Sequence, residues 1–489
     1  MIAFENTFSS LPASLYSVVN PTAVRLPHLI RLNDRLAEEL GLDTQWLQAA
    51  DGLAALSGNA VASGSRPIAF AYAGHQFGNF VPQLGDGRAI LLGEVVDRDG
   101  TRRDIQLKGA GRTPYSRRGD GRAALGPVLR EYIVSEAMNA FGVPTTRALA
   151  AVATGDRVQR ETGLPGAVLT RVAASHIRVG TFQYAAARGD SEALRRLADY
   201  VIARHFPQAG DADNRYLAMF DLVVRAQASL IAHWMSLGFI HGVMNTDNMA
   251  ISGETIDYGP CAFMDIYDPA KVFSSIDQFG RYAFGNQPRV AAWNLARLAE
   301  ALLPLIDEKQ DRAVTLVQEM LGGFREMFDE AHLRRMRKKL GLSTEKLEDA
   351  RLVEDLLEAM HQDQADFTMT FRSLSLLPAD EKGPGRLTDL FSDPTRIVAW
   401  YDRYNARLRL DPVAPQEREQ AMLQINPRFI PRNHRIESVI RAAVYENDYA
   451  PFHDLVRVLA TPFSDEPVNG GYELPPRPDE EVLQTFCGT

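Results

Sequence analysis

The sequence predicts an α+β protein in which a lobe containing a β-sheet comes before a larger, helical lobe. Short runs rich in apolar and β-branched residues, such as "AILLGEVVD" and "DIQLKGAG", are concentrated in residues 67–173. From about residue 190, apolar residues recur at helical spacing instead. We therefore divide the chain into residues 1–185, an N-terminal extension with the sheet-containing lobe, and residues 186–489, the helical lobe with a C-terminal extension and tail.

The first lobe is expected to contain a helical entry, several strands and one long helix. Residues 1–60 are predicted to be mostly helical, because "LIRLNDRLAEELGLD" has helical spacing and a glycine that stops the helix. The two β-rich runs follow, separated by the turn-like "DRDGTRR". We then expect a helix at "LGPVLREYIVSEAMNAFGVP", ended by Gly142 and Pro144, and further strands at "TRALAAVATG" and "GAVLTRVA".

The second lobe opens with the clearest helices, "EALRRLADYVIARHF" and "YLAMFDLVVRAQASLIAHWMSLGF". Residues 290–375 are also predicted to be helical. A stretch rich in Pro and Asp at residues 378–396 interrupts the pattern, and helices resume to about residue 460. The tail "DEPVNGGYELPPRPDEE" is predicted to be irregular.

Composition narrows the class of protein. Of the 489 residues, 45% are apolar and 24% are charged, which is the mixture of a globular protein. The net charge of −9 does not favour nucleic-acid binding, and no apolar run is long enough to span a membrane. The start, "MIAFENTFSS", lacks the features of a signal peptide, and the two cysteines suit a reducing compartment. We expect a cytoplasmic monomer without nucleic-acid or membrane partners.

The phosphate-loop, zinc-protease and nucleophile-elbow motifs are absent from the sequence. The candidate functional residues are therefore polar and charged residues on the predicted strands, helices and turns. Lys108 ends the strand "IQLK", where a cation can hold phosphate, and the next helix offers Glu131 or Glu136 as its partner. Asn248 and Asp257 lie nine residues apart across a predicted turn, and their side-chain oxygens suit Mg²⁺. Taken singly, each residue also fits an ordinary surface, turn or capping role.

These residues occur in the order found in protein kinases. His241 and Asn248 in "HGVMNTDN" have the separation of the kinase motif H-R-D-x-x-x-x-N, and "DYG" stands in the place of D-F-G. Val243 occupies the position of the kinase catalytic base. The sequence therefore predicts a protein-kinase-like two-lobed fold. It leaves open whether the chain is a silent nucleotide-binding scaffold or an enzyme that uses ATP differently.

Four long motifs are more specific: "YAGHQFGNFVPQLGDGRAILLGE", "DIQLKGAGRTPYSRRGDGRAALGPVLREYIVSEAM", "GVMNTDNMAISGETIDYGP" and "NPRFIPRNHRIE". They closely resemble the selenoprotein O (SelO) family of pseudokinases, and the resemblance runs from about residue 4 to the C-terminus. It implies ATP bound in a flipped orientation, transfer of AMP with release of pyrophosphate, and a requirement for Mg²⁺ or Mn²⁺. It also implies that the acceptors are Ser, Thr or Tyr hydroxyls of proteins, including the chain itself.

The resemblance assigns roles to particular residues. It places Lys108 on phosphate and against Glu131, and it places Asn248 and Asp257 on the metal ion. It implies that Asp247 accepts the proton of the acceptor hydroxyl. The other implied nucleotide-binding residues are Gly85, Gly87 and Arg88 in the cleft, Asp120 and Gly121 at the flipped adenosine, and Arg171 and Arg178 at the terminal phosphates.

A redox role is implied by the same resemblance, because many members are controlled through a cysteine or selenocysteine third from the C-terminus. Cys487 in "FCGT" matches that position. Some members carry a partner cysteine in the loop after the metal-binding Asp, where this chain has only serines in "KVFSSIDQFGRY". Cys261 is the remaining candidate partner, and the alternative is that Cys261 is buried and inert.

Two other functions stay open at this point. The same site could transfer UMP or phosphate in place of AMP. The chain could also be a catalytically silent scaffold, which Val243 favours and the retained Lys108, Asn248 and Asp257 oppose.

Overall fold

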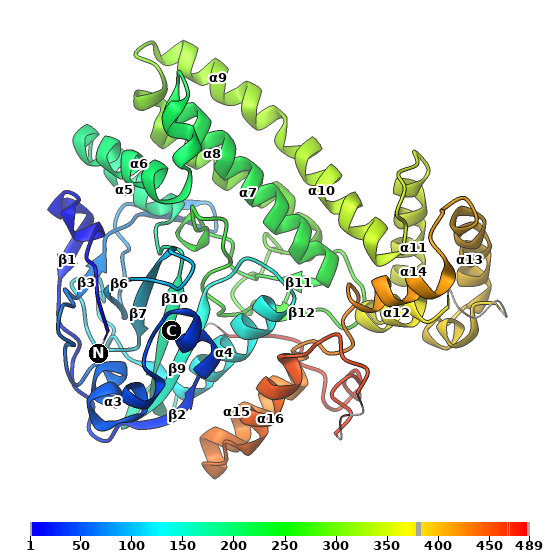
Figure 1. Cartoon of the computed structure of the whole chain (residues 1–489), viewed down its shortest axis with the longest axis horizontal. Helices are drawn as coiled ribbons and strands as arrows, with labels where there is room; N and C mark the ends of the chain where they lie inside the picture. Colours follow the sequence, from blue (N-terminus) through cyan, green and yellow to red (C-terminus); the bar gives the residue numbers. More distant parts are fainter. Residues whose placement is uncertain (1, 378–382, 467, 469, 487–489) are drawn as a thin grey trace.

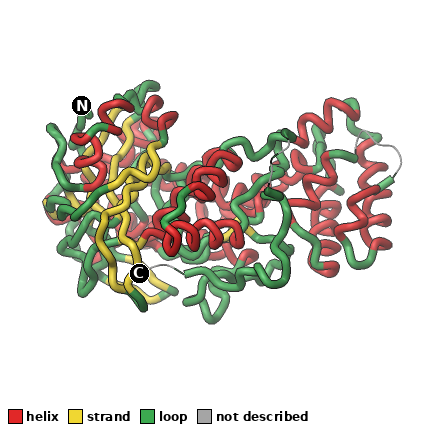
Figure 2. The backbone as a smooth tube through the Cα atoms, turned by 90° about the horizontal axis from the view of Figure 1, so that it is seen from below, coloured by secondary structure: helices red, strands yellow, loops and turns green. Residues whose placement is uncertain are grey.

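The computed structural model describes residues 2–377, 383–466, 468 and 470–486. The strands gather at one end of an elongated molecule, and helices occupy the middle and the opposite end (Figure 2). The expected mixture of α and β structure is therefore confirmed, with the sheet formed mainly by the first part of the chain (Figure 1). The division at residue 185 stays a prediction.

The main sheet of the described residues is antiparallel throughout, and its strands follow the order β1-β3-β6-β7-β10-β9-β2, with β8 paired to β10. Its strands are β1 (Tyr16–Val18), β2 (His28–Leu32), β3 (Ile68–Phe70), β6 (Ala89–Val96), β7 (Arg102–Lys108), β8 (Ala123–Ala124), β9 (Arg147–Gln159) and β10 (Gly163–Ala173). Among the described residues, two two-stranded sheets lie outside it: β4 (Gly74–Gln76) with β5 (Asn79–Val81), and β11 (Phe239–Ile240) with β12 (Ala262–Phe263). The order places β7 and β10 side by side, which matters for the site below.

Both faces of this sheet are covered. On β6, Ile90 and Leu92 point into a core shared with three short helices, α1 (Asp34–Glu39), α2 (Thr44–Gln48) and α3 (Ala50–Ser57). Leu91 points to the other face, into the large core that contains helix α4 (Leu125–Ala140). Successive side chains of a strand face opposite ways, so burial on both sides explains why "AILLGEVV" is apolar except at Glu94.

The prediction of a mostly helical entry over residues 1–60 is wrong in part. The run "HLIRL" forms strand β2, which pairs with β9, and β1 is also extended. Helix α1 begins only after Asn33, whose side chain accepts a hydrogen bond from the backbone N–H of Leu36 at 3.2 Å. Short apolar runs fit both helix and strand, and pairing with a distant strand decides between them here.

The predicted helices of the second lobe are confirmed, and α4 links them to the sheet. Helix α4 lies between the sheet and two C-terminal helices, with the rings of Tyr132 and Phe452 5.4 Å apart (Figure 1). The helices after the sheet are α5 (Val179–Ala187), α6 (Ser191–His205), α7 (Arg215–Leu237), α8 (Gln287–Ile306), α9 (Gln310–Gly322), α10 (Phe324–Lys339), α11 (Asp349–Asp363), α12 (Phe367–Ser375), α13 (Pro394–Leu408), α14 (Pro415–Leu423), α15 (Asn433–Arg441) and α16 (Ala450–Leu459). None of the helices in the described ranges combines the length and apolar character needed to cross a membrane.

A separate hydrophobic core joins α10 to α14 at the end of the molecule away from the sheet (Figure 1). Arg432, from the motif "NPRFIPRNHRIE", ties this part to the middle of the chain. Its fully buried guanidinium pairs with Asp265, which follows β12, and with Asp366 at 2.8 Å. Asp366 also caps α12 by accepting from the N–H of Met369 at 2.7 Å.

We predict that Arg432→Met destabilises the protein by about 3–5 kcal/mol, because it leaves two carboxylates without their common cation in a poorly hydrated place. Arg457→Met is the control, since Arg457 forms an exposed pair with Asp454 and such pairs contribute about 1 kcal/mol or less. Denaturant and thermal unfolding of the two variants measure the difference. Equal unfolding midpoints would contradict the importance of the Arg432 cluster.

Candidate active site

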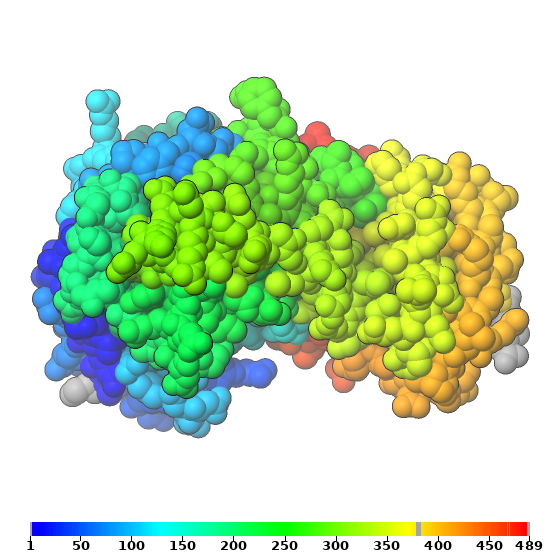
Figure 3. Space-filling model, turned by 90° about the horizontal axis from the view of Figure 1, so that it is seen from above, coloured from blue at the N-terminus to red at the C-terminus, as the bar shows by residue number. Residues whose placement is uncertain are grey.

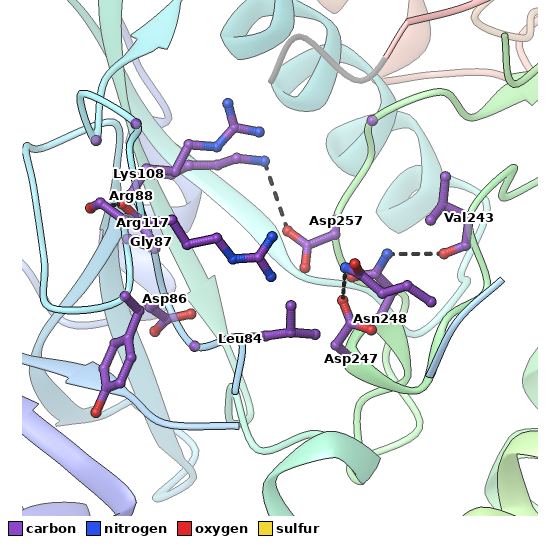
Figure 4. Close-up of a pocket in the computed structure, with 18 of the residues that line it drawn as sticks. Leu84, Asp86, Gly87, Arg88, Lys108, Arg117, Val243, Asp247, Asn248 and Asp257 are labelled. Carbon is purple, nitrogen blue, oxygen red and sulfur yellow. Dashed lines mark hydrogen bonds and ion pairs between the residues drawn. The ribbon is translucent and has the colours of Figure 1, made fainter. Parts of the chain in front are cut away.

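A cavity of about 810 Å³ lies between the sheet and the segment 243–260, within the size range of small-molecule sites. Residues expected at the site from the sequence line it: Gly85, Gly87, Arg88, Lys108, Asp120, Gly121, Arg171, Arg178, Asp247, Asn248 and Asp257. Figure 4 shows them in two opposing groups. Arg88 and Lys108 lie on the sheet side, and Asp247, Asn248 and Asp257 lie across from them.

Lys108 is the last residue of β7, and its side chain points into the cavity toward Asp257 (Figure 4). Its Nζ lies 2.6 Å from Oε2 of Glu131 on α4. Glu136, the other candidate partner, pairs instead with Arg147 at 2.8 Å. Burial and the charge of Arg171 lower the pKa of Lys108, although Glu131 acts in the opposite direction. Of the two glutamates, Glu131 is therefore the one that holds the lysine.

Arg171 connects this pair to the opposite wall. It lies on β10, beside β7, and is buried, with its Nε on Oε1 of Glu131 and its Nη2 2.5 Å from Oδ1 of Asp257. Arg178 approaches the other oxygen of Asp257 at 2.5 Å. Lys108 is 3.8 Å from Asp257. Burial opposes ionisation of Asp257, but Arg171, Arg178 and Lys108 outweigh it and hold the pKa of Asp257 well below its usual range. The five side chains form one buried network of alternating charge.

Asp257 is held in an unusual backbone conformation. Its φ is +64°, in the left-handed region that residues other than glycine seldom adopt. Such strain persists where the surrounding structure fixes it, and it is common at functional sites. Here the contacts with Arg171 and Arg178 fix the carboxylate between the two walls.

Asp247 and Asn248 lie on a short 3₁₀ turn, Thr246–Asn248, next to Asp257. Asn248 donates its Nδ2 to the carbonyl of Val243 at 3.0 Å, which leaves its Oδ1 as an acceptor. Asp247 Oδ1 is buried and has no hydrogen-bond partner among the described residues. Burial raises the pKa of Asp247 to about 6. These oxygens, with those of Asp257, are the donors that the site offers to a hard cation.

Asp120 and Gly121 lie at the rim of the cavity, where Asp120 pairs with Arg160 at 2.9 Å. Gly121 has φ +69°, and a Cβ there would lie 2.1 Å from the carbonyl oxygen of Gly111. Only glycine fits this close approach of two loop segments. The loop that carries these residues therefore depends on Gly121 for its shape.

Asp86, Gln76 and Tyr72 also line the cavity, although the sequence did not single them out. Asp86 stands between the two expected glycines, is buried, and lies 3.7 Å from Arg178. Gln76 approaches Asp247 at 3.4 Å, and the ring of Tyr72 lies 4.7 Å from the Arg178 guanidinium. All three belong to the quoted motif "YAGHQFGNFVPQLGDGR", but no spacing rule separates them from their neighbours.

Cys261 is not part of the cavity lining. Cys261 is fully buried, and burial raises the pKa of its thiol to about 12, so it stays protonated and is a poor nucleophile. Thr485 in the tail donates its hydroxyl to the carbonyl of Pro260, the residue before Cys261, at 2.6 Å. Cys487 lies outside the described residues, so its redox role stays a prediction.

A cavity of this size, lined by buried cations and by carboxylates opposite them, is suited to hold the phosphates of a nucleotide. The comparisons with known proteins agree. Residues 1–460 match the model of the family described as "Protein adenylyltransferase SelO". The chain belongs to the SelO family, and it is a nucleotidyltransferase.

Relatives cover the chain almost completely. Proteins named "Protein nucleotidyltransferase YdiU" are 60% identical over 486 residues in Bradyrhizobium diazoefficiens, covering 99% of both chains, and 60% identical over 488 residues in Rhizobium rhizogenes, covering 100% of this chain and 97% of the relative. A protein of the same name from Rhodopseudomonas palustris is 59% identical over 486 residues, covering 99% of both chains. The name of these relatives does not favour the hypothesis that the chain is a catalytically silent scaffold.

Proposed function

We propose that this chain is a protein adenylyltransferase with a protein-kinase-like fold. It transfers AMP from ATP to Ser, Thr or Tyr hydroxyls of proteins, its own included, and releases pyrophosphate. The observation that carries the proposal is the arrangement of Lys108, Arg171 and Arg178 around Asp257 in one cavity, with Val243 where a kinase would have its base.

The cations account for the leaving group. Transfer of AMP breaks the bond between the α-phosphorus and the oxygen that leads to pyrophosphate, and negative charge accumulates on that oxygen. Lys108, Arg171 and Arg178 converge on Asp257, so they can turn to the phosphates when a nucleotide enters. Arg171 and Arg178 are buried, and buried guanidinium groups stabilise such charge more strongly than water does.

The acceptor hydroxyl needs a group that takes its proton, and Asp247 fits this role. Burial raises the pKa of Asp247 to about 6, which makes it a stronger base than an exposed aspartate. Gly74 leaves room for its carboxylate, because a Cβ at that position would lie 2.4 Å from Asp247 Oδ1. In the proposed reaction Asp247 accepts the proton as the hydroxyl oxygen bonds to the α-phosphorus.

The donor set also fits Mg²⁺ or Mn²⁺ bound together with the nucleotide. The oxygens of Asn248 and Asp257 would hold the ion, and Asp247 Oδ1 is a buried oxygen without a partner among the described residues. No group of three or more His, Cys, Asp or Glu in the described ranges could hold a metal, and Mg²⁺ is often bound by one or two carboxylates with substrate phosphates. A bound ion would neutralise charge on the phosphates during transfer.

The test of the proposed function is which phosphorus reaches protein. We expect label on acceptor proteins, including the chain itself, from ATP labelled at the α-phosphate and none from ATP labelled at the γ-phosphate. UTP labelled at the α-phosphate is the parallel arm, because the relatives' name specifies no base. Label from γ-labelled ATP alone would refute nucleotidyl transfer, and stronger labelling from UTP would replace AMP by UMP.

Asp257→Ala is predicted to abolish transfer but to preserve, or strengthen, binding of ATP without metal. The substitution removes an oxygen donor for the metal, and it also releases Arg171 and Arg178 to bind phosphate. Calorimetry with ATP in the presence and absence of Mn²⁺ separates these effects from activity. The control is Asp221→Ala, which removes a carboxylate from a helix surface pair with Arg225. Metal-dependent transfer at the normal rate in Asp257→Ala would exclude the proposed ligand.

Asp247→Asn is predicted to slow AMP transfer by about 10²- to 10⁴-fold, the usual cost of losing a general base, while ATP affinity changes little. Val243→Asp should not create transfer of the γ-phosphate, because a base at that position does not reverse the orientation of the nucleotide. Rates with both labels, and binding measured separately, test the pair of variants. A normal rate in Asp247→Asn, or γ-transfer by Val243→Asp, would mean that the loop works differently.

A further inference from the structure

A cationic surface outside the nucleotide cavity is formed by Arg281, Trp293 and Arg297, which we call the Arg–Trp–Arg platform. Arg281 lies in the loop between β12 and α8, and the other two residues lie one turn apart on α8. The guanidinium carbons of Arg281 and Arg297 are 4.8 and 5.0 Å from the centre of the Trp293 ring. Stacking on an aromatic ring restricts each guanidinium, so that its outer N–H groups are presented in a fixed direction.

The platform carries more positive than negative charge. Arg281 has no carboxylate partner among the described residues, and the Nε atoms of both arginines are buried without a hydrogen-bond acceptor. Arg297 pairs with Glu300 at 2.6 Å, where Glu300 is half exposed. The carboxylate of the nearby Asp277 accepts hydrogen bonds from the backbone N–H groups of Arg281, at 2.9 Å, and Tyr282, at 2.7 Å. A cationic surface on a chain of net charge −9 suits an anionic partner.

The platform is joined to the turn that carries Asp247. Tyr282, next to Arg281, donates its hydroxyl to Asn245 Oδ1 at 2.5 Å, and Asn245 lines the cavity. On the other side the ring of His75 lies 5.1 Å from Trp293, and the backbone N–H of His75 donates to Thr246 Oγ1 at 2.7 Å. The platform is therefore held on both sides by the residues that immediately precede Asp247.

The segment that contributes Arg281 to the platform also carries exposed apolar side chains. Ile276 lines the cavity and is 53% exposed, and Phe279, two residues before Arg281, is 97% exposed. The chain between β12 and α8 projects at the upper edge of the molecule in Figure 3, where it is green. These side chains are available to contact an acceptor protein at the cavity.

We propose that the Arg–Trp–Arg platform binds a carboxylate side chain of the acceptor polypeptide, so that the enzyme prefers hydroxyls in acidic segments. The inference rests on the proposed function, because it requires a polypeptide acceptor. A carboxylate can accept paired hydrogen bonds from a guanidinium, and it supplies the charge that Arg281 lacks. Arg281 and Arg297 are thus specificity-determining residues that act on acceptor binding, not on the chemical step.

The experiment compares AMP transfer to dephosphorylated casein, an acidic protein, with transfer to the same casein after its carboxyl groups are converted to amides. For the wild type, amidation is expected to raise KM for the acceptor by about 10-fold or more, the loss expected for a charge-assisted hydrogen bond. For the double variant R281Q/R297Q, KM should be raised to the same extent with both caseins. Its kcat should stay within about 2-fold of the wild-type value, because the substitutions remove binding that is equal in the ground state and the transition state. The effect should shrink with added salt.

Arg289→Gln is the matched control, because Arg289 is exposed on α8 but lies outside the platform. It should leave KM unchanged, and ATP affinity should be the same in all variants. Three results would overturn the proposed role of the platform while AMP transfer itself remained. They are a wild-type KM for casein in the double variant, an equal rise of KM in Arg289→Gln, and a wild-type enzyme with the same KM for the two caseins. Wild-type enzyme that labels no protein would instead refute the proposed function as well. If the double variant unfolds, the single variants R281Q and R297Q are compared on the two caseins in its place.

Discussion

The buried ion network around Asp257 constrains the rest of the structure. An isolated buried charge is expensive, and a buried ion pair offsets that cost only where each charged group meets a partner of opposite charge. Glu131 meets Lys108 and Arg171, and Asp257 meets Arg171 and Arg178. These residues come from β7, α4, β10 and two connecting segments, so the network forms only when the sheet order brings β7 beside β10 and α4 packs on that face.

Close backbone contacts hold the second wall against this network. A Cβ at Gly180 would lie 2.1 Å from the carbonyl oxygen of Ala73 and 3.4 Å from Cα of Asp247, so the start of α5 and the segment before β4 meet over the Asp247 turn. This contact excludes water from the carboxylate of Asp247, and burial is the main cause of its raised pKa. The same packing that joins the two walls thus produces the chemical property on which the proposed base depends.

The sequence predicts those parts of the site that depend on local pattern. Lys108 is recognisable at the end of an alternating strand, and Asn248 and Asp257 are recognisable from their spacing around a turn. The choice of Glu131 over Glu136 depends on how α4 is rotated against β7 and β9, which a helical pattern of mainly buried residues does not determine. Local pattern does not predict strand β2 either, because its pairing partner β9 lies more than 100 residues away in the sequence. Arg281 and Trp293 likewise give no sign of stacking until a loop is folded onto α8.

The network also explains how so many charges remain stable in a site that must bind a polyanion. In the structure the carboxylate of Asp257 pairs with Arg171 and Arg178, the two arginines that the phosphates would need. A nucleotide alone would take both arginines from that carboxylate and leave it only Lys108, 3.8 Å away, whereas a nucleotide that carries a divalent cation would supply a new partner for each side. The arginines then exchange one anion for another, and Asp257 exchanges guanidinium for metal, so no buried charge is left unpaired. On this argument the proposed requirement for a metal would follow from the protein's own salt bridges as well as from the chemistry of phosphate transfer.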